Sequence, residues 1–171
     1  MNYRRLGKTG LKVSEFSYGS WVTFSFQFGV DTAIELMKFA YDHGVNFFDN
    51  AEAYAGGESE IIMGKAIKKL GWNRDSFIIS SKVFWGGEKP TQRGLNHKHI
   101  IDCCNTALKR MQVDYLDLYF CHRPDPETPI EETVRAMHTL IMQGKICYWG
   151  TSEWSATDIK QAFKVSRELG L

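Results

Sequence analysis

Four residues of the types that act as acids, bases or hydrogen-bond donors stand at or just after the ends of strand-like segments. Asp49 ends FFD, Lys82 ends IISSK and His122 ends LYFCH. Tyr54 follows Asp49 by five residues, in the loop AEAYAGGE. Each residue alone has an ordinary explanation, as a turn carboxylate, a packed ring, a solvated strand end or a loop histidine. Their shared position at the ends of three neighbouring strands favours a common site.

The chemistry available to these four residues is the reduction of a carbonyl group. Hydride transfer to a carbonyl carbon leaves negative charge on the oxygen, and an acid must neutralise that charge with a proton. The phenol of Tyr54 is a weak acid, and the ammonium of Lys82 would stabilise the phenolate that forms. Asp49 would hold Lys82 protonated and in place. His122 would donate a hydrogen bond to the oxygen of a small carbonyl substrate.

The elements that must position these residues alternate between short apolar segments and amphipathic helical segments. Five pairs are expected, at 16–21 with 31–44, 46–51 with 58–71, 77–84 with 97–111, 115–122 with 131–144, and 146–152 with 155–170. Strict alternation indicates a parallel sheet covered by helices. Before the first pair, YRRLGKTGLKVSEF predicts a β-hairpin around Gly7 to Gly10. No linker interrupts the series, so residues 1–171 are expected to form a single domain.

Two α/β architectures fit such a pattern, an open doubly wound sheet and a closed barrel. The doubly wound sheet would carry GxGxxG after its first strand. The sequence after Phe16 is SYGSWVTFSFQFG, whose glycines are too far apart. A (β/α)8 TIM-type barrel gathers its reactive side chains at the C-terminal ends of successive strands, as here, but takes roughly 250 residues. We therefore predict a barrel of this type truncated after about five β/α units, with an N-terminal β-hairpin.

Charge and composition exclude several classes of partner. The chain has 21 Lys and Arg against 20 Asp and Glu, a net charge of +1, so no long-range field would attract nucleic acid or an anionic membrane. No apolar run approaches the roughly 20 residues of a membrane span, and the N-terminus MNYRRLGKTGLKVSE lacks the apolar stretch of a secretory signal. We expect a cytoplasmic protein with no nucleic-acid partner and no membrane insertion.

Metal binding is not predicted from the spacing of cysteine and histidine. The cysteines are at positions 103, 104, 121 and 147, without a CxxC pair. Cys103 and Cys104 are neighbours in a helical segment and point about 100° apart, so they cannot both face one ion. His97 and His99 open the same helical segment, where residues two apart do not face each other. We expect both histidines at the surface.

Several segments resemble a known family. FFDNAEAY, SSKVFWGG and YFCHRPDP are similar to the aldo-keto reductases, which place an Asp, Tyr, Lys, His tetrad on a (β/α)8 barrel and use NADPH. WVTFSFQF, HRPDPETPIEETVRAMHTLIMQGK and YWGTSEWS more closely resemble the branch with the β subunits of voltage-gated potassium channels and their bacterial reductase relatives. The similarity covers essentially the whole chain.

The resemblance implies roles for individual residues. NADPH would be the cofactor, contacted by Trp21, Gln27, Asp49 and Ser152, with Asp49 against the nicotinamide ribose and Ser152 at the carboxamide. The substrate pocket would be lined by Trp21, Trp85 and His122. The catalytic residues would be the four named above.

Two functions are compatible with this resemblance. His122 stands where the channel subunits have Asn, which favours a working NADP(H)-dependent oxidoreductase that reduces aldehydes or ketones to alcohols. The alternative is a non-catalytic truncated barrel, or a regulatory protein like a potassium-channel β subunit. A barrel of five units would leave strand edges unpaired, and a second copy of the chain or a partner chain would then complete it.

Overall fold

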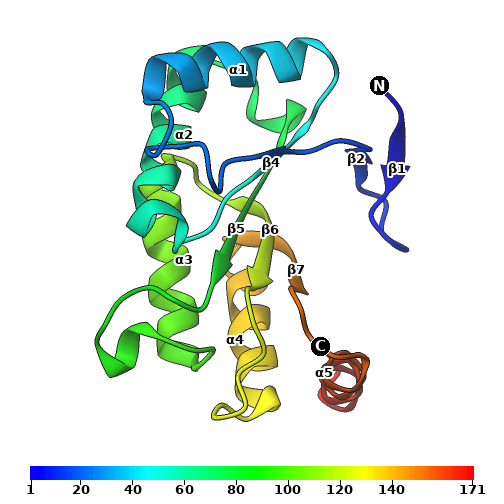
Figure 1. Cartoon of the computed structure of the whole chain (residues 1–171). Helices are drawn as coiled ribbons and strands as arrows, with labels where there is room; N and C mark the ends of the chain where they lie inside the picture. The colour runs from blue at the N-terminus through cyan, green and yellow to red at the C-terminus, as the bar shows by residue number, and fades with distance from the viewer.

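The computed structural model describes residues 1–171, and its strands and helices follow the predicted order (Figure 1). A two-stranded antiparallel hairpin precedes a five-stranded parallel sheet of order β3-β4-β5-β6-β7. The strands are β1 (Tyr3–Arg5), β2 (Lys12–Ser14), β3 (Tyr18–Gly19), β4 (Phe47–Asp49), β5 (Ile78–Val83), β6 (Leu116–Cys121) and β7 (Ile146–Thr151). The predicted hairpin and the predicted five strand–helix units of a TIM-type barrel are confirmed.

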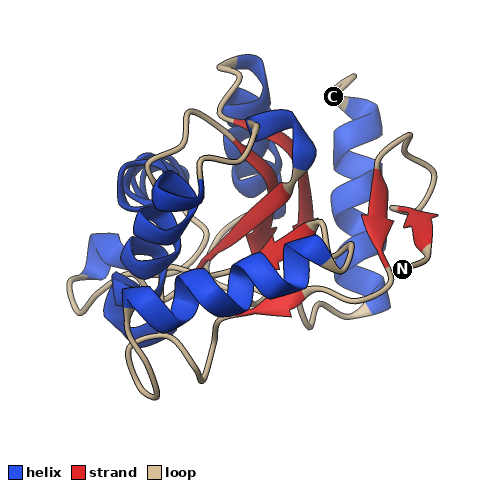
Figure 2. Ribbon diagram, turned by 90° about the horizontal axis from the view of Figure 1, so that it is seen from above, coloured by secondary structure: helices blue, strands red, loops and turns tan.

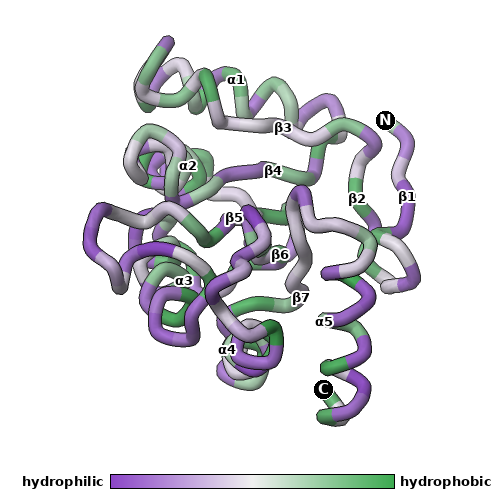
Figure 3. Tube along the Cα trace, turned by 60° about the horizontal axis from the view of Figure 1, so that its bottom comes forward, coloured by the Kyte–Doolittle hydropathy of each residue, from purple (hydrophilic) through white to green (hydrophobic).

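Four helices connect the parallel strands and a fifth follows the last strand, and the five pack in sequence order, each against the next. They are α1 (Val30–Asp42), α2 (Glu58–Leu70), α3 (His97–Met111), α4 (Ile130–Met142) and α5 (Ala156–Glu168), with 3-10 turns η1 (Tyr54–Gly57), η2 (Arg74–Ser76) and η3 (Pro90–Gln92). Figure 2 shows the helices around the outside of the strands. Hydrophobic and hydrophilic stretches alternate along the helices, as amphipathic packing requires (Figure 3). No helix combines the length and the apolar character that crossing a membrane requires.

The core between sheet and helices follows from the alternation of side chains along the strands. In β5 all six residues are buried, and Ile79 and Val83 belong to the large core cluster under the helices. Ile78 faces the other side, where it packs with Leu118 and with Val13 of the hairpin. The hairpin therefore packs against the inner face of the sheet near the N-terminal ends of the strands, and it leaves the C-terminal ends open.

Local sequence signals fix two of the helix ends. The hydroxyl of Ser155 accepts the N–H of Asp158, and the carboxylate of Asp158 accepts the N–H of Ser155, so a capping box starts α5. Gly71 ends α2 in the left-handed conformation that favours glycine.

Gly64 lets α2 approach α3 closely, because a Cβ there would lie 2.4 Å from the carbonyl oxygen of Arg110.

Candidate active site

The four predicted catalytic residues lie at the C-terminal edge of the sheet. Asp49 is the last residue of β4, Lys82 is the penultimate residue of β5, and His122 directly follows β6. Tyr54 begins the 3-10 turn η1 in the loop after β4. The strands are parallel and in register, with Asp49 paired to Ser80, so their carboxyl ends meet at one place.

The ammonium group of Lys82 is the centre of this site. Its Nζ donates to Asp49 Oδ2 at 2.6 Å, to the carbonyl oxygen of Asn50 at 2.9 Å and to the hydroxyl oxygen of Tyr54 at 3.0 Å. These contacts use all three N–H groups of the ammonium, so its orientation is fixed. Ser80 Oγ donates to Asp49 Oδ1 at 2.6 Å and holds the carboxylate in turn. The Tyr54 oxygen receives a hydrogen bond from a cation and keeps its own proton for another acceptor.

Aromatic rings form the wall around the Tyr54 hydroxyl. The Trp21 ring stacks on the Tyr54 ring, with 6.1 Å between the ring centres. The His122 ring lies edge-on to two rings, with its centre 5.8 Å from that of Tyr54 and 5.0 Å from that of Trp85. These residues line a cavity of about 410 Å³ together with Ala53, Lys82, Arg123, Ser152 and Glu153. The structure thus brings the three predicted substrate-pocket residues together. The 66% exposure of Trp21 places it at the mouth.

A second cavity, of about 250 Å³, lies next to the first on the inner face of the sheet. It is lined by Ser17, Phe47, Asp49, Lys82, Phe120, Thr151 and Ser152. Lys82 and Ser152 border both cavities. Of the predicted cofactor residues, Asp49 and Ser152 line this second cavity and Trp21 lines the first. Gln27 is exposed and lines neither, so the structure does not bring it to the others.

His122 is buried and its imidazole is neutral near pH 7. Burial, and then the positive charges of Lys82 and Arg123, lower its pKa to about 4. Its Nδ1 atom is buried without a hydrogen-bond partner. A neutral imidazole has one N–H to donate and adds no further positive charge beside Lys82. This is the state suited to orienting a carbonyl oxygen.

We predict that His122 makes the free energy of unfolding depend on pH. Its ordinary pKa of 6.5 applies in the unfolded chain and a value of about 4 in the folded one, so the unfolded chain binds more protons in this range. The contribution of His122 to the free energy of unfolding is fully present above pH 6.5 and is lost as the pH falls toward 4. The wild type should therefore lose more stability than His122→Asn over this window in urea unfolding.

If the free energies of unfolding of the wild type and His122→Asn changed equally with pH, a lowered pKa of His122 would be contradicted. His97→Asn, which replaces an exposed histidine, is the matched control.

Arg123 and Glu153 also line the larger cavity, although they were not predicted. Arg123 donates from Nη1 to the carbonyl oxygen of His122 at 2.6 Å and forms an ion pair with Glu153 at 2.9 Å. Its guanidinium lies 5.1 Å from the centre of the Trp85 ring. The only sequence signal was the position of Arg123 directly after His122, in HRPDP. This charged pair closes the side of the cavity next to His122 and Ser152.

The prediction that His99 lies at the surface is wrong. Its side chain is 5% exposed, and its Nε2 atom lies 3.2 Å from Glu52 Oε2, whereas His97 is exposed as expected. His99 faces inward because it lies on the side of α3 that packs against the core, with Ile100 and Cys103. Spacing within the helical segment could not reveal its partner on a distant loop.

Comparison with known proteins places this chain in a family. Residues 15–170 match the model of the Aldo/keto reductase family. The chain therefore belongs to the aldo/keto reductase family, which confirms the resemblance found in the sequence.

Two similar curated proteins carry the same description. A "probable voltage-gated potassium channel subunit beta" of Arabidopsis thaliana is 54% identical over 171 residues, which are 100% of this chain and 52% of that protein. A protein of the same description from Oryza sativa subsp. japonica is 52% identical over 171 residues, again 100% of this chain and 52% of that protein. The chain spans about half the length of these relatives.

A solved structure shares the fold. The crystal structure of a thermostable aldo-keto reductase in complex with the inhibitor epalrestat matches with a TM-score of 0.84 and 35% sequence identity. The match covers 96% of this chain and 58% of that chain.

Proposed function

We propose that this chain provides the acid–base centre of an NADP(H)-dependent oxidoreductase that reduces aldehydes or ketones to alcohols. The observation that carries the proposal is the single ammonium of Lys82, which contacts both the Tyr54 hydroxyl and the Asp49 carboxylate. A phenol beside a fixed cation, at the edge of an open cavity, is suited to giving up its proton as negative charge develops on a substrate oxygen.

In the proposed reaction, NADPH would, when bound, supply the hydride that reduces the carbonyl carbon. Tyr54 gives its hydroxyl proton to the carbonyl oxygen, and the O–H bond of the phenol breaks as the O–H bond of the alcohol forms. Lys82 stabilises the phenolate that remains, and Asp49 compensates the charge of Lys82. His122 donates its N–H to the same carbonyl oxygen and orients it. Proton uptake from water then restores the Tyr54 hydroxyl.

The residues present fit the nicotinamide end of the cofactor. The second cavity is bounded by the flat ring of Phe120 and offers the carboxylate of Asp49 and the hydroxyl of Ser152 as hydrogen-bonding groups. It adjoins the substrate cavity at Lys82, so a nicotinamide in the second cavity would face a carbonyl held beside Tyr54. We propose Asp49 and Ser152 as its contacts in this cavity, with Trp21 contacting the cofactor from the adjoining one.

Titration of the purified chain with NADPH tests this proposal. We expect saturable quenching of tryptophan fluorescence, because Trp21 and Trp85 lie at the cavity, together with reduction of a small aldehyde. Ser152→Ala should weaken NADPH binding several-fold, because it removes one neutral hydrogen bond. Ser166→Ala removes a hydroxyl from α5, away from both cavities, and is the matched control. Folded protein that shows neither binding nor turnover would contradict the proposal.

A second candidate function is a non-catalytic role in an assembly. Two curated relatives at 54% and 52% identity are named as potassium channel β subunits. The outer strand β7 and the exposed Ile159 and Phe163 of α5 offer an edge and an apolar face that a second copy or a partner chain would cover. Under this proposal the protein is cytoplasmic, and the cofactor site reports cofactor state rather than turning over substrate.

A further inference from the structure

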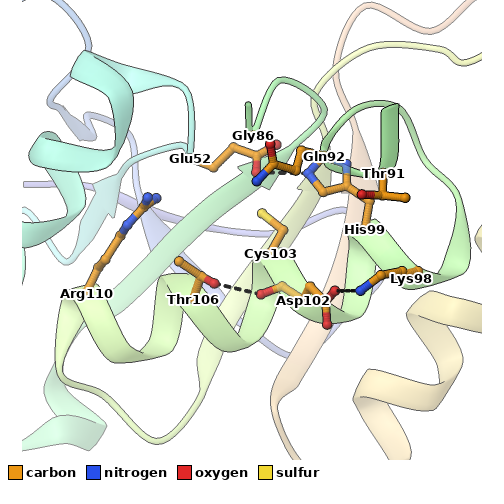
Figure 4. Close-up of a pocket in the computed structure, with 10 residues that line it drawn as sticks. All are labelled: Glu52, Gly86, Thr91, Gln92, Lys98, His99, Asp102, Cys103, Thr106 and Arg110. Carbon is orange, nitrogen blue, oxygen red and sulfur yellow. Dashed lines mark hydrogen bonds and ion pairs between the residues drawn. The ribbon is translucent and has the colours of Figure 1, made fainter. Parts of the chain in front are cut away.

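Glu52, His99 and Cys103 come together in a cavity separate from the active site (Figure 4). The cavity has a volume of about 280 Å³ and shares no lining residue with the two cavities beside Lys82. The three residues are 5%, 4% and 5% exposed. The carboxylate oxygen, imidazole nitrogen and thiol sulfur all lie within 4.8 Å of one another. These are three of the atom types that bind zinc in proteins.

Helix geometry accounts for two of the three positions. His99 and Cys103 are four residues apart in α3, so they lie on the same face, one turn from each other. Glu52 comes from the loop after β4 and is held by two bonds to β5 and the residue after it. Its N–H donates to the carbonyl oxygen of Lys82, and its Oε1 accepts the N–H of Phe84. Its Oε2 is thereby turned toward α3.

The imidazole of His99 is oriented as a metal ligand would be. Its Nδ1 lies 2.9 Å from the carbonyl oxygen of Gly94. A carbonyl oxygen can only accept, so Nδ1 carries a proton and Nε2 faces Glu52 Oε2 and Cys103 Sγ. Metal-binding histidines commonly donate their other ring N–H to a backbone carbonyl in this way, which fixes the ring.

Gly86 leaves space in front of these atoms. A Cβ at this position would lie 2.6 Å from both Glu52 Oε2 and His99 Nε2. With metal–ligand bonds of about 2.0–2.3 Å, ligand atoms in a tetrahedral zinc site are roughly 3.3–3.6 Å apart. The 3.2 Å between Nε2 and Oε2 lies just below this range. Cys103 Sγ lies within 4.8 Å of both atoms.

We propose that Glu52, His99 and Cys103 bind a zinc-like divalent cation, with a water molecule from the cavity as the fourth ligand. The thiol releases its proton on binding, and so does Nε2 where it is protonated. The carboxylate and the thiolate then balance the two charges of the cation. A thiolate in the ligand set favours zinc over magnesium or calcium. The nearby cations Arg110 and Lys98 are already paired, with Glu60 and Asp102.

Titration with Co²⁺, followed by displacement with Zn²⁺, tests the proposal without using reductase activity. All proteins carry Cys147→Ser, which removes the exposed thiol. We expect one Co²⁺ per chain and a thiolate-to-cobalt charge-transfer band. Cys103→Ser should abolish the band, and Cys103→Ser and His99→Gln should each weaken binding at least about tenfold. Gly86→Ala should also weaken it at least about tenfold, although it removes no ligand.

Cys104→Ser is the matched control, because Cys104 is buried in the same helix but is not part of the cluster. It should keep both the band and the affinity, and circular dichroism checks that each variant is folded. The proposal is overturned if folded protein binds no Co²⁺, if Cys103→Ser keeps the band, or if Cys104→Ser loses it.

Discussion

Replacing Tyr54 with phenylalanine is expected to lower the rate of carbonyl reduction by about 100- to 10,000-fold, the usual contribution of a general acid. The substitution removes only the hydroxyl, which contacts Lys82 Nζ at 3.0 Å, and it keeps the ring that stacks on Trp21. NADPH affinity should therefore change little. The measurement is kcat for a small aldehyde together with NADPH binding by fluorescence.

Tyr41→Phe is the control for this experiment. The Tyr41 hydroxyl also makes one side-chain hydrogen bond, at 2.8 Å to Ser76, but it lies on α1, outside both cavities. Its loss should leave kcat unchanged. In Tyr54→Phe the rate of oxidation of the corresponding alcohol should fall together with the rate of carbonyl reduction, because both directions use the same proton. Turnover above about a tenth of wild type would exclude Tyr54 as the acid.

Replacing Lys82 with methionine is expected to abolish turnover and also to destabilise the fold. Three hydrogen bonds disappear, and Asp49 loses the cation that compensates its charge. Removing one partner of a fully buried ion pair typically costs about 3–5 kcal/mol. The Asp49 side chain is 24% exposed, so water offsets part of this cost. We expect a loss of about 2–4 kcal/mol in the free energy of unfolding, measured with urea.

A double substitution separates the two effects. Asp49→Asn with Lys82→Met removes the uncompensated charge, so it should be more stable than Lys82→Met alone while remaining inactive. Lys38→Met is the control, because Lys38 pairs with Asp42 at the surface and should change stability by less than about 1 kcal/mol. If the double variant were no more stable than Lys82→Met, the pairing of Asp49 with Lys82 would not explain the loss.

The two candidate functions differ in what Tyr54 does. An oxidoreductase needs its proton in every cycle, whereas an assembly protein that senses the cofactor needs only the binding surface. Saturable NADPH binding without turnover, unchanged by Tyr54→Phe, would favour the second candidate. Turnover that depends on Tyr54 would favour the first.

The sequence by itself determined the order of the elements and the edge of the sheet on which the site lies. Alternating apolar strands and amphipathic helices require parallel strands, because each crossover returns the chain to the same end. Asp49, Lys82 and His122 each end a strand-like segment of the sequence, so their common location follows from that direction alone. The family likewise follows from local segments such as FFDNAEAY and YFCHRPDP.

Only the tertiary structure decided which side chains touch. The three hydrogen bonds of Lys82, the pairing of Arg123 with Glu153 and the burial of His99 against Glu52 join atoms from different strands, loops and helices. Such contacts depend on sheet register, on helix rotation and on the path of loops, which leave no periodic trace in the sequence. For the same reason Gln27, placed near the cofactor by resemblance, lies on an exposed turn outside both cavities.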